Sequence, residues 1–215
     1  MKKSVLAVAL SGALLAGSAL AHEAGNTIFR VGGVFVNANS QSKTTTSVPV
    51  TLDVNNNAQV GLTATYMVTD NIGVELLGAT PFSHRITASV PAANLGLGEV
   101  VKVKHLPPSL YAQYYFLDKN SGSRPYIGAG LNYTRFFGAK ALNPAITNLQ
   151  VKKHSFGPVA NIGIDVKLTD NLSFNTAMWY THIKTKAKFT ALNADHEVKI
   201  KLDPVIFFTG LSYKF

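Results

Sequence analysis

The feature that most constrains the fold of this chain is a run of about ten residues in which apolar and polar side chains alternate, repeated along the sequence. A period of two residues is typical of a β-strand whose two faces meet different environments. The runs are 26–38, 57–69, 72–82, 106–116, 125–137, 156–168, 172–189 and the segment that ends at Phe215. The sequence therefore predicts an all-β fold of eight strands, each about as long as a tilted strand that crosses a bilayer.

The connections between these runs alternate in length. Short connections lie around 70–71, 117–124 and 169–171, and longer ones around 39–56, 83–104, 138–152 and 190–197. In an antiparallel sheet this alternation places every short turn at one end. We therefore predict an eight-stranded antiparallel transmembrane β-barrel with short periplasmic turns and longer extracellular loops.

A soluble β-sandwich or a lipocalin-like barrel is the alternative, with the apolar face turned inward and the charges outward. Alternation alone does not separate the two arrangements. Strand length, the alternation of connections and the N-terminal segment favour the membrane barrel.

The first residues have the organisation of a Sec signal peptide. Two lysines precede the apolar stretch SVLAVALSGALLAGSAL, and Ala19-Leu20-Ala21 matches a cleavage signal. A transmembrane anchor is the alternative reading, but the stretch is rich in Ala, Gly and Ser and ends at that signal. We expect residues 1–21 to be removed and 22–215 to form a barrel in the outer membrane of a Gram-negative cell.

The charge and the cysteine count narrow the function classes. The formal net charge is +9, and removal of 1–21 takes away two lysines and no acids, which leaves +7. The basic residues form no long run, so we expect no nucleic-acid partner; the excess charge is available to anionic lipid headgroups or solutes. The sequence has no cysteine, which excludes thiolate metal sites and cysteine nucleophiles.

Catalytic patterns are weak. The pairs Ser83-His84 and His154-Ser155 are adjacent in sequence, so on strands their side chains point to opposite faces. The HEAG segment at 22–25 lacks the second histidine of the H-E-x-x-H zinc motif. We expect no enzyme activity, no metal site and no cofactor.

Several sequence blocks carry a family resemblance. They are HEAG, TYMVTDNIGVELLGATPF, LPPSLYAQYYF, RPYIGAGLNYTRFF, WYTHIKTKA and LDPVIFFTGLSYKF, in order over residues 22–215. They resemble the OmpW family of Gram-negative outer-membrane proteins. The resemblance implies an eight-stranded barrel with a narrow, largely apolar lumen that gives small hydrophobic solutes a route into or through the outer membrane.

The resemblance also implies two lumen residues. In the family a leucine of the E-L-L motif and the tryptophan of the W-Y motif constrict the lower lumen, and these correspond to Leu77 and Trp179 here. The alternation agrees, because Leu77 shares a face with Glu75 and Trp179 shares one with Asn175. The alternative for Trp179 is the aromatic belt at the lipid interface, although Tyr180 occupies the lipid-facing slot.

Four charged residues have inward parity: Arg30, Glu75, Asp165 and Lys167. Uncompensated charges are costly in a barrel interior. We therefore expect Arg30 or another base within ion-pair distance of Glu75, as part of a polar floor below an apolar cavity.

The last strand alternates up to Phe215, which we expect at the periplasmic interface as the signal read by the barrel-insertion machinery. The function that we expect is a porin-like channel for small hydrophobic molecules, with outer-membrane lipids and those solutes as partners. A structural or surface-interaction barrel, of the adhesin or receptor type, is the alternative. The sequence leaves the oligomeric state open.

Overall fold

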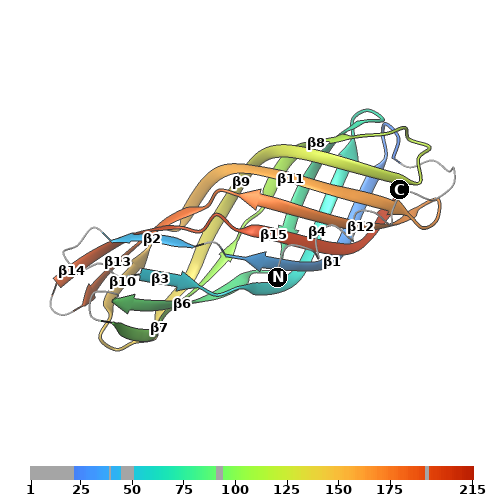
Figure 1. Ribbon diagram of the computed structural model, residues 1–215. Coiled ribbons are helices and arrows are strands. Elements are labelled where there is room, and N and C mark those ends of the chain that lie inside the picture. The colour runs from blue at the N-terminus through green and yellow to red at the C-terminus, as the bar shows by residue number, and fades with distance from the viewer. Residues whose placement is uncertain (1–21, 39, 45–50, 91–93, 192–193) are drawn as a thin grey trace.

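The computed structural model describes residues 22–38, 40–44, 51–90, 94–191 and 194–215, and these residues form strands and short turns (Figure 1). The expected signal peptide, residues 1–21, lies outside the described residues. In the part of the chain that is described, no helix is long and apolar enough to cross a membrane.

Eight strands form the closed ring of the barrel. They are β1 (Thr27–Asn37), β4 (Asn57–Met67), β5 (Ile72–Ala79), β8 (Ser109–Tyr115), β9 (Ser123–Ala141), β11 (His154–Lys167), β12 (Leu172–Thr181) and β15 (Val205–Lys214). Each pairs antiparallel with its neighbours, and the β1–β15 and β9–β11 pairings close the ring. The predicted eight-stranded barrel is confirmed, and closure pairs the backbone groups of the wall without leaving a sheet edge in lipid.

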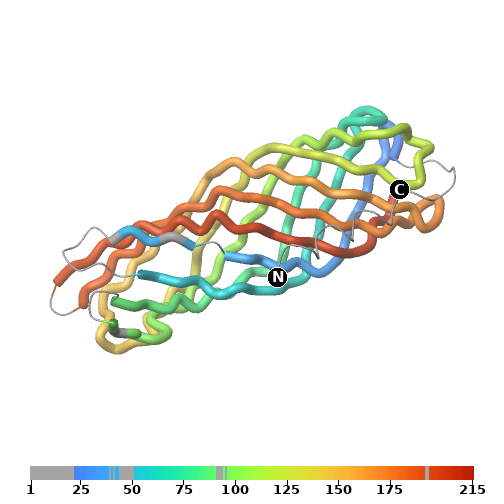
Figure 2. The backbone as a smooth tube through the Cα atoms, in the orientation of Figure 1, coloured from blue at the N-terminus to red at the C-terminus, as the bar shows by residue number. Residues whose placement is uncertain are grey.

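The four long connections contain strands of their own, which differs from the expected loops. These strands are β2 (Gln41–Thr44), β3 (Thr51–Val54), β6 (Phe82–Val90), β7 (Leu95–Leu106), β10 (Thr147–Val151), β13 (Lys184–Ala191) and β14 (Ala194–Lys201). The strands β3, β6 and β7 continue the barrel sheet beyond β9, while β10, β13, β14 and β2 form a separate four-stranded sheet. We call these seven strands the outer extension; they lie at the end opposite the short turns (Figures 1 and 2).

The run expected at 172–189 is two strands rather than one. The chain leaves the barrel sheet at His182 and Ile183, between β12 and β13, and then joins the four-stranded sheet. The alternation of buried and exposed residues continues across this break, which is why the sequence reads as a single strand.

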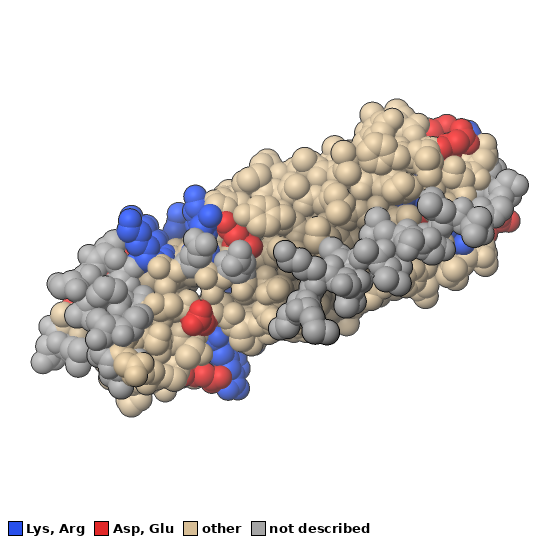
Figure 3. Space-filling model, viewed as in Figure 1, with Lys and Arg blue, Asp and Glu red and all other residues tan. Residues whose placement is uncertain are grey.

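The outward face of the barrel is apolar. Val31, Leu62, Leu76, Leu110 and Leu131 are all more than half exposed. On the face seen in Figure 3, the middle of the barrel carries no described charge, and charged residues gather at the two ends. An apolar outer band around an interior that contains buried charged residues is the arrangement of a membrane barrel and is opposite to that of a soluble one.

The buried apolar side chains form two clusters. One fills the barrel and includes Met67, Leu77, Phe82, Trp179 and Phe208. The other lies in the outer extension and includes residues of β3, β6, β7, β13 and β14. The barrel interior is narrow: a Cβ added at Gly163 would lie 2.4 Å from the Tyr126 ring, so the close approach requires glycine there.

Candidate functional site in the barrel lumen

Leu77 and Trp179 both point into the barrel. Trp179 on β12 is 1% exposed and Leu77 on β5 is 6% exposed, and both belong to the barrel cluster. The Trp179 ring packs edge-on against Phe208, with 6.0 Å between the ring centroids. Tyr180, by contrast, is half exposed on the outer wall. The inward orientation is therefore as expected, while their role as a constriction stays a prediction.

A hydrogen-bond chain holds Trp179 in place. Its indole Nε1 donates to the Tyr111 hydroxyl at 2.8 Å, and that hydroxyl donates to the Glu75 carboxylate. Both partners are almost fully buried. The orientation of the indole thus depends on a carboxylate deeper in the lumen. In the run 106–116 Tyr111 alternates with the lipid-facing Leu110, so its inward orientation follows from the sequence, but nothing in the sequence pointed to the bond to Trp179.

Arg30 joins the two buried acids. It makes an ion pair with Glu75, and its Nη2 and Nε donate to Asp165 at 2.7 and 3.2 Å. Its Nη1 also donates to the Thr65 hydroxyl at 2.6 Å. The expected pairing of Arg30 with Glu75 is confirmed. Because all three charged groups are buried, breaking one pair would leave an uncompensated charge, which is far costlier than losing a surface pair.

Further polar groups complete what we call the polar floor network: Arg30, Glu75, Asp165 and their hydrogen-bond partners His22, Thr65, Tyr111, Tyr115, Asn175 and Ser212. The network lies at the short-turn end of the barrel, where β1 begins. His22 precedes β1, and its Nε2 lies 2.8 Å from Asp165. Arg124 closes that end by donating to the backbone carbonyls of His22, Asp70 and Phe116. No sequence signal pointed to His22 or Arg124 as lumen groups.

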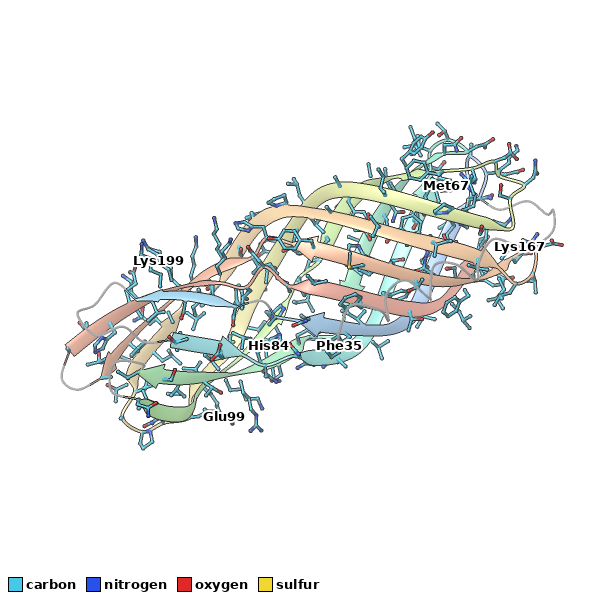
Figure 4. All side chains as sticks on the ribbon, in the orientation of Figure 1. Phe35, Met67, His84, Glu99, Lys167 and Lys199 are labelled. Atoms are coloured by element: carbon cyan, nitrogen blue, oxygen red, sulfur yellow. The ribbon has the colours of Figure 1, made fainter. Side chains whose placement is uncertain are left out.

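Lys167 lies apart from this network. Its Nζ donates to Asp170 in the adjoining turn at 2.7 Å, and its side chain is 10% exposed. Figure 4 labels it at the short-turn end of the barrel. Of the four residues expected in the polar floor, the structure brings together Arg30, Glu75 and Asp165.

An apolar cavity of about 330 Å³ lies in the outer extension. Its walls come mainly from Val, Ile, Leu, Ala and Phe side chains of β3, β6, β7, β13 and β14. The buried rings of His84 and His105 stack in its lining, 4.9 Å apart. Next to them, Phe82 of the barrel cluster stacks on His105 with 5.4 Å between centroids, so the histidines mark the inner end of the cavity. Figure 4 labels His84 near the point where β6 leaves the barrel.

The two histidines differ in their hydrogen bonding. His84 Nδ1 donates to the backbone carbonyl of Asn55 at 2.7 Å, whereas His105 Nδ1 is buried without a partner among the described residues. Burial lowers the pKa of His105 to about 3, with a smaller effect from His84. His105 is therefore neutral at physiological pH.

Phe215 lies on the outer surface and is 69% exposed. Its ring packs edge-on against Phe29 and Tyr213, at 5.7 and 4.7 Å between centroids. These aromatic residues stand together at the short-turn end of the outer wall. Its role in assembly stays a prediction.

Comparison with known proteins agrees with this architecture. The OmpW family pattern matches residues 23–215. The chain is 40% identical to outer membrane protein W of Vibrio cholerae over 220 residues, which covers all of both chains. The crystal structure of OprG from Pseudomonas aeruginosa is 33% identical, with a TM-score of 0.83 over 91% of this chain and 98% of that one.

Two further relatives are informative. The solution structure of Escherichia coli outer membrane protein W is 39% identical, with a TM-score of 0.61 over 90% of this chain and all of that one. The dibenzothiophene metabolism operon protein PahQ of P. aeruginosa is 22% identical over 150 residues, 70% of this chain and 68% of that protein. With a closed eight-stranded wall, an apolar outer band and these relatives, the chain belongs to the OmpW family and is an outer membrane protein of Gram-negative bacteria.

Proposed function

We propose that this protein admits small, mostly apolar molecules to the outer membrane, with the cavity in the outer extension as their first binding site. The cavity carries the proposal. Its volume of about 330 Å³ falls within the ~300–1,000 Å³ that is usual for small-molecule sites. A solute that enters leaves water for an apolar lining, which is worth about 25 cal/mol for each Å² buried.

Two polar groups at the inner end of the cavity suit a solute with one polar end. In its neutral form His84 donates from Nδ1 to Asn55, so its Nε2 is an acceptor. His105 Nδ1 has no partner among the described residues. PahQ, the distant relative named for dibenzothiophene metabolism, is linked by that name to an apolar aromatic compound, which fits a solute of this kind.

Leu77 and Trp179 would form the barrier below the cavity, and the polar floor network would close the lumen beneath them. Trp179 is held by Tyr111, and Glu75 and Arg30 are buried directly beyond. An apolar solute gains nothing by displacing paired charges. The solute must therefore leave sideways through the wall or wait for Leu77 and Trp179 to move.

The test is to remove the barrier. Trp179→Ala combined with Leu77→Ala should widen the lumen and raise single-channel conductance in planar bilayers, and a small apolar solute should block that current. The matched control is Tyr180→Ala with Leu76→Ala, one residue along on the same two strands but on the lipid-facing side. Its conductance should equal that of the wild type.

The alternative is a surface-interaction barrel, and the observation in its favour is that side chains fill the barrel part of the lumen. The same recordings separate the two. Unchanged conductance in the Trp179/Leu77 variant, with the fold confirmed by its heat-dependent gel shift, would mean that the constriction lies elsewhere or that the barrel is no channel.

A further inference from the structure

Lysines stand directly opposite one another on the outward face of the four-stranded sheet. In the register of this sheet Lys184 faces Lys201, and Lys199 lies between Lys186 and Lys43. All five side chains are exposed or half exposed. Like charges directly opposite on neighbouring strands destabilise a sheet. This lysine face, which we define as Lys43, Lys184, Lys186, Lys199 and Lys201, therefore costs free energy unless an anion covers it.

The acids nearby neutralise only part of this charge. Glu197 lies 3.0 Å from Lys186, and Asp203 lies 2.8 Å from Lys201. Among the described residues, Lys43, Lys184 and Lys199 make no ion pair within 4.0 Å. The lysines form two rows across the sheet, Lys184 with Lys201 and Lys186 with Lys199 and Lys43. The positive charge that no acid neutralises lies on these two rows, which are the ones nearest the barrel.

Charge is also divided unequally between the ends of the protein. The described residues within 38–56, 80–106, 135–154 and 182–204, at the outer end, hold thirteen Lys and Arg and five Asp and Glu. The rest of the chain from residue 22 onward holds five Lys and Arg and six Asp and Glu. On the face seen in Figure 3, lysines and arginines gather accordingly over the outer extension.

The lysine face continues the lipid-facing wall of the barrel. Tyr180 points outward from β12, and Lys184 and Lys186 lie on the same side of the chain as it runs into β13. On the neighbouring strands Lys199 and Lys201 share the outward side with Phe207 of β15. At about 3.4 Å per residue, the lysines begin within about 14 Å of the last lipid-facing aromatic residue. This is the level of lipid headgroups, where Tyr and Trp also concentrate.

We propose that the lysine face binds the phosphate groups of the phosphorylated glycolipid of the outer leaflet, lipopolysaccharide. Ammonium groups act as point charges toward phosphate. A phosphate group bound between the two rows would attract the lysines of each row and so offset the repulsion between lysines that face one another. A lipid source fits better than free phosphate, because the face is continuous with the apolar wall and the acyl chains would pack against that wall.

The first test measures retention of lipid. The full barrel is reconstituted into phosphatidylcholine nanodiscs with added lipopolysaccharide and then washed. Native mass spectrometry then quantifies the lipopolysaccharide that stays bound to the protein. Replacement of Lys43, Lys186 and Lys199 by Gln should weaken retention about fivefold for each lysine, so about a hundredfold together. The matched variant, with Arg at the same three positions, should retain lipid as the wild type does.

Two further arms identify the source of the phosphate. Lipopolysaccharide from which the lipid A phosphates have been removed should be retained weakly by the wild type and equally by the Gln variant. Inorganic phosphate at equal phosphorus concentration should not displace the intact lipid. Equal retention by the wild type and the Gln variant, loss of binding in the Arg variant, indifference to dephosphorylation, or displacement by inorganic phosphate would each overturn the proposal.

The second test measures thermal stability in detergent. It can be carried out even if a variant folds poorly in nanodiscs. In a zwitterionic detergent the Gln variant should unfold at a temperature no lower than the wild type, because the facing charges of Lys43, Lys186 and Lys199 are gone. Added lipopolysaccharide should raise the unfolding temperature of the wild type and leave that of the Gln variant unchanged. An equal rise in both proteins would show that the lipid binds elsewhere.

Discussion

Tyr111→Phe tests the hydroxyl group that connects Trp179 to the polar floor network. The substitution keeps the ring and removes two hydrogen bonds, one donated to Glu75 and one accepted from Trp179 Nε1. The site is 2% exposed, so water cannot easily replace the lost partner. The matched control is Tyr114→Phe, on the same strand but half exposed on the outer wall.

The structure sets the size of the effect. A hydrogen bond to a charged group contributes about 1.5–3 kcal/mol, and a buried donor left without a partner costs about 1–3 kcal/mol. Glu75 keeps its bonds from Arg30 and Thr65, which limits its share of the loss. We therefore expect the free energy of unfolding to fall by about 2–5 kcal/mol for Tyr111→Phe and by less than about 0.5 kcal/mol for Tyr114→Phe.

The assay is reversible urea unfolding in lipid vesicles, followed by tryptophan fluorescence. Trp179 is the single tryptophan of the sequence, so the signal reports on the site itself. A double-mutant cycle with Glu75→Gln should give a coupling free energy above about 0.5 kcal/mol, as residues in one network do. If Tyr111→Phe unfolds with the wild-type midpoint and slope, the hydroxyl does not hold Trp179 and the reasoning is refuted.

Two other predictions concern the ends of the molecule. Since burial lowers the pKa of His105 to about 3, while a histidine in the unfolded chain titrates near about 6.5, the unfolded segment takes up its proton first as pH falls. The outer extension should therefore lose stability between about pH 6.5 and 3, seen as faster hydrogen exchange in β6 and β7. His105→Phe should weaken that dependence, and the remainder comes from His84, whose pKa burial also lowers; exchange that does not change with pH would contradict it. Phe215→Ala should lower the amount of assembled barrel in cells far more than the stability of barrel refolded in vesicles, because its exposed ring packs only against Phe29 and Tyr213 among the described aromatic residues; normal surface levels would count against an assembly role.

Periodicity explains which parts of the site could be predicted from the sequence. A strand with one face in lipid must alternate, so the inward orientation of Arg30, Glu75, Leu77 and Trp179 follows from their parity. The bond between Tyr111 and Trp179 joins strands 68 residues apart in sequence, and no local pattern encodes such a contact.

The outer extension was missed for a different reason. Its segments are rich in Asn, Thr, Ser and Lys, which is typical of loops. Part of the signal was present all the same, because buried Val101 and Val103 alternate with Lys102 and Lys104 on β7. Short alternations of this kind are difficult to separate from chance, and the pairing partners of β7 lie on β6 and β9, outside any local window.

The proposed function requires both a stable barrel and a cavity that opens to solutes, and the structure keeps these two in different parts of the molecule. The paired charges of Arg30, Glu75 and Asp165 lie inside the closed eight-stranded ring, where opening would expose uncompensated charge. The cavity lies in the outer extension, and among the described residues its four-stranded sheet pairs with no barrel strand. Local opening takes least free energy where few contacts must break. Under the proposed function, a solute would therefore enter by movements of the outer extension while the barrel stays closed, and Leu77 and Trp179 would separate the cavity from the polar floor network.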